Sequence, residues 1–170
     1  VAALSGNSRN DVALYLGTLV AGGCMVPLSG MASTEALALM VADCEARFLF
    51  ISGQQRELFG RLRALLTKVP GERIISLAGP LDGAGYSLVD WLAQTTATAR
   101  PEPVTLDDPF NIIYSSGTTG TPKGILHDYR FRQRQMVRMS RYGLDGEAIN
   151  LVSTPLYSNT TLVSVAAPWC

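Results

Sequence analysis

The sequence is poor in the side chains that bind metals. It contains one histidine and three cysteines (Cys24, Cys44 and Cys170), which lie far apart and form no C-x-x-C pair. Protein zinc sites need several such ligands at short spacings, so the composition excludes a zinc-ligand cluster. Isolated cysteines are typical of reduced thiols, and we expect a cytoplasmic protein.

A surplus of one charge is also missing. Fourteen basic residues cancel fourteen acidic ones, which excludes the basic surplus typical of proteins that bind nucleic acid or anionic membranes. The uncharged run over residues 12–34 is long enough to span a bilayer, but Gly22, Gly23 and Pro27 interrupt it. We therefore expect a buried helix followed by a strand, with no transmembrane segment and no signal peptide.

What the sequence does have is alternating short apolar runs and helical patterns, in a chain that is 47% hydrophobic. The patterns predict strands at 1–4, 24–28, 48–51, 74–77, 110–114 and 149–153. They predict helices at 11–21, 35–43 with Ser33 or Thr34 as cap, 54–68, 87–94, 127–142 and from 160 onward. This alternation predicts an α/β fold with a largely parallel sheet flanked by helices.

Residues 95–108 are polar and have three prolines in or next to them, which is typical of a surface connection. The chain begins without methionine in an apolar strand and stops in apolar sequence. We expect residues 1–170 to be part of a domain in a longer protein.

The eleven residues Y-S-S-G-T-T-G-T-P-K-G, at 114–124, suit a phosphate-binding loop or a flexible turn. Glycines let backbone N–H groups face an anion, hydroxyls add donors and Lys123 adds positive charge. The loop is not Walker A, because Pro122 precedes Lys123 and Gly124 follows it. It also fails the G-x-G-x-x-G dinucleotide pattern.

The motif closely resembles the signature loop of the acyl-adenylate-forming superfamily, which includes acyl-CoA synthetases, peptide-synthetase adenylation domains and firefly luciferases. L-V-A-G-G-C-M-V-P-L at 19–28 is similar to the family's upstream segment. T-P-L-Y-S at 154–158 resembles the Pro-Leu-Phe-His segment that borders the acyl pocket, with Ser158 in place of the histidine. The resemblance implies the ATP-binding N-terminal domain, with the C-terminal domain and its catalytic lysine beyond residue 170.

The resemblance also implies the roles of individual residues. The phosphate-binding residues would be Ser115, Ser116, Gly117, Thr118, Thr119, Gly120 and Lys123, with Thr119 and Lys123 as catalytic residues. Ser115 would lie near Mg²⁺, while Tyr157 and Ser158 would line the substrate pocket. The alternative for Tyr157 is a purely structural role, as a buried tyrosine at the end of a strand. ATP, Mg²⁺ and coenzyme A are the implied cofactors and co-substrates.

The implied reaction is activation of a small carboxylic acid by ATP, followed by transfer to a thiol. Residues 148–170 carry no charge, so the ammonium of an amino acid would lack a counter-ion there. This favours an acid with an uncharged tail over an amino acid. The alternatives are an amino-acid adenylation domain and a non-catalytic module that binds nucleotide or a partner. We expect the 170-residue chain alone to be inactive and to self-associate through exposed apolar surface.

The predicted helix at 127–142 carries Arg130, Arg134, Arg138 and Arg141 at helical spacing, with Arg132 off that line. The row suits either an anion-binding patch or an ordinary solvated helix face.

Overall fold

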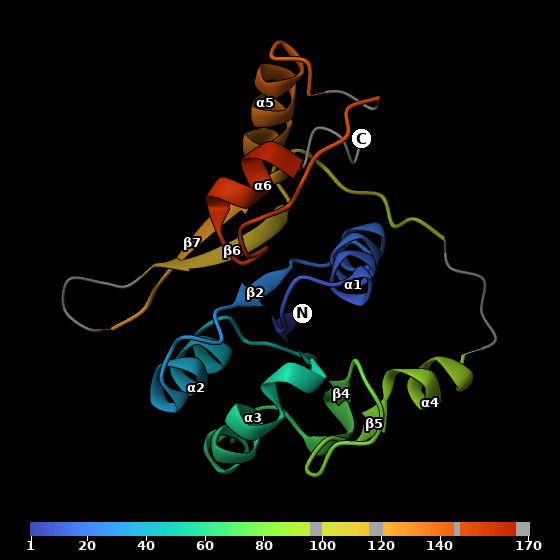
Figure 1. Cartoon of the computed structure of the whole chain (residues 1–170), viewed down its shortest axis with the longest axis vertical. Helices are drawn as coiled ribbons and strands as arrows, with labels where there is room; N and C mark the ends of the chain where they lie inside the picture. The colour runs from blue at the N-terminus through green and yellow to red at the C-terminus, as the bar shows by residue number, and fades with distance from the viewer. Residues whose placement is uncertain (96–99, 116–120, 145–146, 166–170) are drawn as a thin grey trace.

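A computed structural model describes residues 1–95, 100–115, 121–144 and 147–165 of the chain (Figure 1). Five parallel strands form a sheet in the order β2-β1-β3-β4-β5. The strands are β1 (Ala2–Leu4), β2 (Val26–Leu28), β3 (Leu49–Ile51), β4 (Ile74–Ser76) and β5 (Tyr86–Ser87). The predicted α/β fold with a largely parallel sheet is confirmed, and β5 is a strand that the sequence patterns did not predict.

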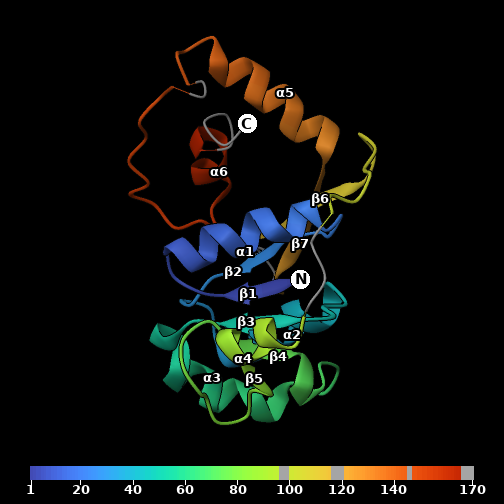
Figure 2. The same cartoon turned by 90° about the vertical axis from the view of Figure 1, so that its right-hand side faces the viewer.

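Helices cover both faces of this sheet (Figures 1 and 2). Helices α2 (Thr34–Asp43) and α3 (Arg56–Leu62) pack on one face with Leu49 and Ile51, whereas α1 (Arg9–Val20) and α4 (Leu88–Ala93) pack on the other with Phe50. Successive strand side chains point to opposite faces, which is why β3 is apolar throughout. The result is a three-layer arrangement with one apolar core on each side of the sheet.

The helix boundaries follow side-chain caps. Ser8 Oγ accepts a hydrogen bond from the Asp11 backbone N–H at 3.1 Å, and Ser33 Oγ accepts one from Ala36 at 3.2 Å. These bonds satisfy backbone donors that the first helical turn leaves free. Of the two predicted caps for α2, Ser33 is therefore the one used. Gly22, with φ at +66°, follows the end of α1, as the glycine pair predicts.

A second unit follows the parallel sheet in the chain. Strands β6 (Pro109–Ser115) and β7 (Lys123–Asp128) form an antiparallel hairpin, followed by α5 (Tyr129–Ser140) and α6 (Asn159–Val165). The prediction of a helix from residue 127 is wrong at its start, because His127 lies in β7 and Asp128 caps α5. The glycine-rich loop therefore closes a hairpin and does not lead directly from a strand into a helix.

The hairpin is attached to the open edge of the parallel sheet. Met25 and Asn111 form a parallel bridge, in which the Met25 N–H donates to Phe110 O and the Ile112 N–H donates to Met25 O. Strand β6 therefore runs in the same direction as β2. Its carboxyl end, where the glycine-rich loop begins, points to the same edge as the carboxyl ends of the parallel strands.

Two further predictions are wrong. In place of the helix expected at 54–68, the structure has the shorter helix α3, with 3-10 turns at 53–55 and 63–65. The helical region ends because the backbone of Leu66 is extended, and the side chains of Leu66 and Val69 are buried in the core. The strand expected at 149–153 does not form. Ile149 and Leu151 face solvent, and the Asn150 side chain donates to the Ser164 carbonyl at 2.7 Å.

Across the described ranges, no helix combines the length and apolar character that a bilayer crossing requires.

Removing core volume from β3 should destabilise this fold. Leu49 has no exposed surface and lies between β1 and β4, so Leu49→Ala should cost about 2–5 kcal/mol of unfolding free energy. Urea denaturation would measure the loss. The matched control is Leu39→Ala on α2, where the leucine is 56% exposed and the change should be small. Equal losses in the two variants would contradict the assigned core.

Candidate functional site

The glycine-rich loop lies between two exposed residues that face each other across the hairpin. Ser115 ends β6, Lys123 begins β7, and the two are paired in the strand register. Five of the predicted phosphate-binding residues lie outside the described residues: Ser116, Gly117, Thr118, Thr119 and Gly120. The hairpin register therefore brings a hydroxyl and an ammonium to the base of the loop, both open to solvent.

Gly124 allows the two strands of the hairpin to pack closely at the base of the loop. It is paired with Tyr114, and a Cβ at this position would lie 3.2 Å from the tyrosine ring and 3.0 Å from the Ile112 Cγ2. Glycine alone leaves this space free, so the ring of Tyr114 can lie across β7. The last glycine of the motif thus has a packing role as well as any role in the loop.

Tyr114 fixes the hairpin to the first sheet unit. Its hydroxyl lies 2.5 Å from Asp43 Oδ2 and 3.1 Å from the Met40 carbonyl, both at the end of α2. Burial and the Asp43 carboxylate raise the pKa of Tyr114, so the phenol keeps its proton and donates. The strand that carries the loop is therefore attached to a helix that covers one face of the parallel sheet.

A cleft opens at the carboxyl ends of the parallel strands. In the strand order, the chain moves from β1 to β2 on one side and to β3 on the other, which makes the β1/β3 boundary a topological switch point, where open α/β sheets bind ligands. We call the cavity there, with a volume of about 300 Å³, the switch-point cleft. It is lined by Ser5, Gly6, Asn7, Gly30, Met31, Gln55, Ser153, Pro155 and Tyr157.

The predicted substrate-pocket residues lie at this cleft and at the start of α6. Tyr157 is half-buried and lines the cleft, whereas Ser158 directly precedes α6 and its carbonyl accepts from the Leu162 N–H at 3.3 Å. No strand precedes them, so Tyr157 does not mark the end of a strand. Residues 154–158, here the pocket segment, are held mainly by side chains from other elements.

A buried arginine joins the hairpin to α6. Arg132 on α5 is fully buried, and its guanidinium makes five contacts of 2.7–3.1 Å with uncharged acceptors. The acceptors are Asn111 on β6, His127 on β7, Gln135 on α5 and Asn159 on α6. The rings of Phe110 and Phe131 lie 5.8 and 5.5 Å from its Cζ. One planar side chain thus fixes four elements in relation to each other.

Arg132 also sets the protonation of His127. Arginine only donates, so the 3.1 Å contact makes His127 Nδ1 an acceptor and leaves the ring proton on Nε2. Burial, and next the charge of Arg132, lower the pKa of His127. At neutral pH the imidazole is therefore uncharged and stacked on Phe131, with ring centroids 4.4 Å apart.

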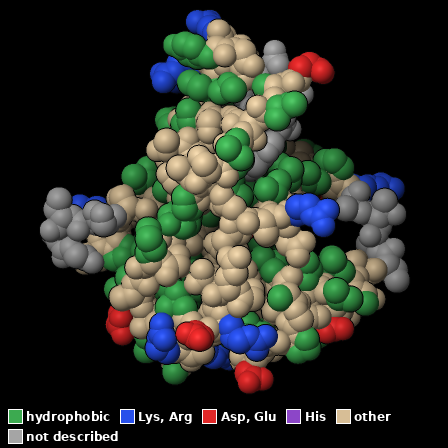
Figure 3. Space-filling model, viewed as in Figure 1, with side chains coloured by type: hydrophobic (Ala, Val, Ile, Leu, Met, Phe, Trp, Pro, Cys, Tyr) green, Lys and Arg blue, Asp and Glu red, His purple; other side chains and the backbone are tan. Residues whose placement is uncertain are grey.

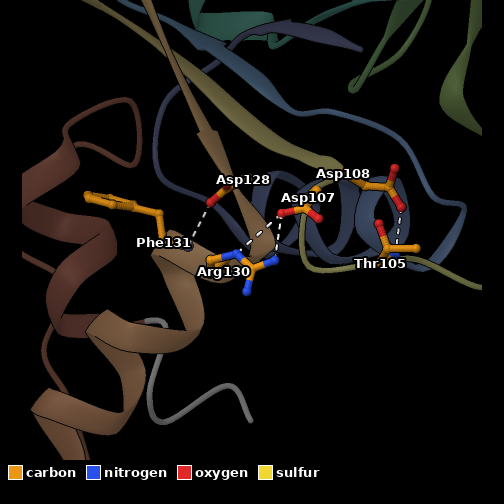
Figure 4. A network of polar contacts seen from close by, with 6 residues as sticks. All are labelled: Thr105, Asp107, Asp108, Asp128, Arg130 and Phe131. Carbon is orange, nitrogen blue, oxygen red and sulfur yellow. Dashed lines mark hydrogen bonds and ion pairs between the residues drawn. The ribbon is translucent and has the colours of Figure 1, made fainter.

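The start of α5 is held by acidic residues (Figure 4). Asp128 Oδ1 accepts from the Phe131 N–H at 2.7 Å, and Arg130 contacts Asp107 at 2.6 Å. The ion pair is exposed, so its contribution to stability is small. Farther along the helix, Arg134 and Arg138 are exposed, and Figure 3 shows basic side chains gathered at the upper end of the molecule, where α5 ends.

The described residues at the base of the loop offer a hydroxyl group on Ser115 and an ammonium group on Lys123. Within the described ranges, no group of three or more His, Cys, Asp or Glu side chains is placed to hold a metal ion. The Ser115 hydroxyl is a hard oxygen donor of the kind that Mg²⁺ accepts.

Together these features define an α/β unit in which the base of the glycine-rich loop and a cleft lie on one edge of the sheet. The family model described as AMP-binding enzyme matches residues 1–170, and the chain belongs to this family. The recognition made from the glycine-rich loop is confirmed, including its relationship to both acyl-CoA ligases and adenylation domains.

Relatives of both kinds match the chain. A 3-hydroxybenzoate–CoA ligase from Aromatoleum sp. (strain CIB) is 29% identical over 74% of the chain and 24% of its own length. A nonribosomal peptide synthetase, ecdA from Aspergillus rugulosus, is 31% identical over 72% of the chain and 2% of its own length. The crystal structure of ATP-bound MatB from Rhodopseudomonas palustris has a TM-score of 0.76 at 26% identity, covering 98% of this chain and 32% of MatB. The chain thus spans at most about a third of these proteins.

Two residues of the site were missed by the sequence patterns. Arg132 was noted only as lying off the arginine row, although that offset places it on the buried face of α5. Asn7 lies between the strand predicted at 1–4 and the helix predicted at 11–21 and had no assigned role, although its side chain contacts the backbone of Thr154 and Leu156. An offset charge in an amphipathic helix was the available signal for Arg132, whereas nothing local signalled the partners of Asn7.

Replacing the buried guanidinium should cost stability even when the charge is kept. Lysine has three donors on one nitrogen and cannot reach four separate acceptors, so Arg132→Lys should lose about 1–3 kcal/mol in urea denaturation. Arg134→Lys, on the exposed face of the same helix, is the control and should change stability by less than about 0.5 kcal/mol. A stable Arg132→Lys protein would contradict the role assigned to the network.

The lowered pKa of His127 predicts a pH effect on stability. In the unfolded chain His127 takes up a proton near pH 6.5, whereas in the folded chain it does so only at lower pH. The contribution of neutral His127 to the free energy of unfolding is therefore present above pH 6.5 and is lost as pH falls. The raised pKa of Asp11 acts in the opposite sense at lower pH, so the comparison must be with a variant. His127→Gln keeps an acceptor for Arg132. Its unfolding free energy should fall less than that of the wild type between pH 7.5 and 5.5, and parallel profiles would refute the assignment.

Proposed function

We propose that the protein containing this chain activates a carboxylic acid with ATP and transfers the acyl group to coenzyme A. The carboxylate oxygen attacks the α-phosphorus of ATP and pyrophosphate leaves, which gives an acyl adenylate. The thiol then attacks the acyl carbon and AMP leaves. The observation that carries this proposal is the hairpin base with Ser115 and Lys123, on the same sheet edge as the switch-point cleft.

Phosphate binding is assigned to the loop. Ser115, Ser116, Gly117, Thr118, Thr119, Gly120 and Lys123 are proposed to hold the β- and γ-phosphates, with Thr119 and Lys123 as catalytic residues. Their task is to position and neutralise charge that shifts during pyrophosphate departure. The Ser115 hydroxyl is proposed to hold Mg²⁺, which would supply positive charge to the phosphates. The ATP-bound relative at 26% identity supports a nucleotide in this fold.

The acid is proposed to bind beside the pocket segment, where Tyr157 and Ser158 form part of the wall. The uncharged stretch 148–170 supports an acid with an uncharged tail. An amino-acid adenylation domain remains the second candidate, supported by the match to the nonribosomal peptide synthetase. A module that binds nucleotide or a partner without catalysis is the third, and an assay of acid-dependent ATP–pyrophosphate exchange separates it from the other two.

Residues 1–170 are proposed to form part of the N-terminal ATP-binding domain of a cytoplasmic enzyme, with residues 95–108 as a surface connection. The chain by itself is proposed to be inactive and prone to self-association. Ile125 and Leu126 on β7, 48% and 57% exposed, support the latter. A monomer in size-exclusion chromatography of the 170-residue chain would count against it.

The decisive variant is Lys123→Ala in the whole protein. Removing a charge that stabilises the transition state should lower the rate of acid-dependent ATP–pyrophosphate exchange about 10²–10³-fold. Lys68→Ala, which removes the other lysine of the chain from an exposed position, is the control and should be as active as the wild type. Unchanged exchange in the Lys123 variant would refute the role of the loop.

A further inference from the structure

Asn7 holds the backbone of the pocket segment with both ends of its side-chain amide. Its Nδ2 donates to the Thr154 carbonyl at 2.9 Å, and its Oδ1 accepts from the Leu156 N–H at 2.9 Å. These two groups flank Pro155, which has no N–H of its own. The amide therefore pairs with the backbone of the segment as a neighbouring strand would, although Asn7 and Leu156 are 149 residues apart in the sequence.

The opposite side of the segment is held by α6. Thr161 Oγ1 donates to the Pro155 carbonyl at 2.7 Å and lies 2.6 Å from Thr154 Oγ1. The Leu156 side chain is buried in the core on the α1 side of the sheet. These residues have no strand partner in the described structure, and the two hydrogen bonds of Asn7 tie the segment to the turn that follows β1. Tyr157 is the next residue after the one whose N–H Asn7 binds.

We propose that Asn7 is a positioning residue that sets the wall of the acid-binding pocket and thereby the choice of acid. This inference rests on the proposed function of the switch-point cleft and the pocket segment. A displacement of about 1 Å in a substrate-positioning group is enough to change reactivity strongly. The hairpin that carries the phosphate loop has an attachment of its own that does not involve Asn7, the contact between the Tyr114 hydroxyl and Asp43. Loss of the Asn7 amide should therefore affect the acid and spare ATP.

The kinetic test compares Asn7→Ala with Asn10→Ala in the whole protein. Asn10 lies in the first turn of α1, three residues after Asn7, and its side chain donates to the Leu77 carbonyl at 3.1 Å, away from the pocket segment. Two lost hydrogen bonds should raise the KM for the acid about tenfold in Asn7→Ala and alter the order of preference in a panel of acids. The KM for ATP should stay within about twofold, and Asn10→Ala should change neither constant. Reduced folding alone would lower kcat and leave both KM values as they are.

A pH profile of Asn7→Asp gives a second measure. A protonated aspartic acid can donate to Thr154 and accept from Leu156 as the amide does, whereas a carboxylate repels the Thr154 carbonyl. The KM for the acid should fall towards the wild-type value as pH decreases from 8 to 5.5, while Asn7→Ala stays high throughout. The other titratable groups around this position are Arg9 and Asp11 on α1 and Tyr157 on the facing segment. They are common to all variants, and the wild-type profile corrects for them and for titration of the substrate.

Hydrogen exchange separates the two ways in which this inference can fail. In Asn7→Ala the Leu156 amide should exchange faster than in the wild type, and an unchanged rate would overturn the positioning role without any reference to activity. The specificity role would be overturned if Asn7→Ala raised the KM for ATP tenfold, as much as the KM for the acid. It would also be overturned if Asn7→Ala left the KM for the acid unchanged. Absence of acid-dependent exchange in the wild type would instead overturn the proposed function, and the specificity role with it.

Discussion

The second half of the structure depends on the burial of one guanidinium. A charged group taken out of water must have its hydrogen-bonding capacity met, and Arg132 meets it with four neutral side chains from β6, β7, α5 and α6. The cost of burying this charge is offset only when all four elements are in place. The position of α6 beside the hairpin is therefore coupled to the protonation and orientation of His127, which lies four residues after Lys123.

The parallel bridge between Met25 and Asn111 gives this unit its direction. Because β6 runs with β2, the glycine-rich loop and the turns after β1, β2 and β3 share one edge of the structure. Asn111 takes part in both arrangements, since its backbone forms the bridge and its side chain accepts from Arg132. Asn111 is thus a buried residue outside both the loop and the cleft, and it helps to fix the hairpin that carries the loop to the parallel sheet.

Local sequence patterns predicted the parallel sheet well, because β1, β3 and β4 are buried on both faces and read as short apolar runs bounded by turns. They also predict a phosphate-binding role for residues 114–124, because the donor groups lie consecutively in the chain. Patterns failed where long-range contacts decide the outcome. Ile149 and Leu151 alternate as a strand would, yet no partner forms with them in the described structure, and side chains such as Asn150 hold the backbone instead. The helix was expected to begin at His127, although His127 lies in β7 and Asp128 caps α5.

The attachment of Tyr114 to Asp43 has a consequence for exchanging parts between members of the family. The phenol belongs to the glycine-rich motif, but the carboxylate and carbonyl that bind it lie at the end of α2, some seventy residues earlier. The motif is continuous in sequence, but its tyrosine is held by residues of a separate helix. A chimaera that takes the hairpin from one relative and α2 from another would pair the tyrosine of the first with the α2 residues of the second. A working graft would need to carry both.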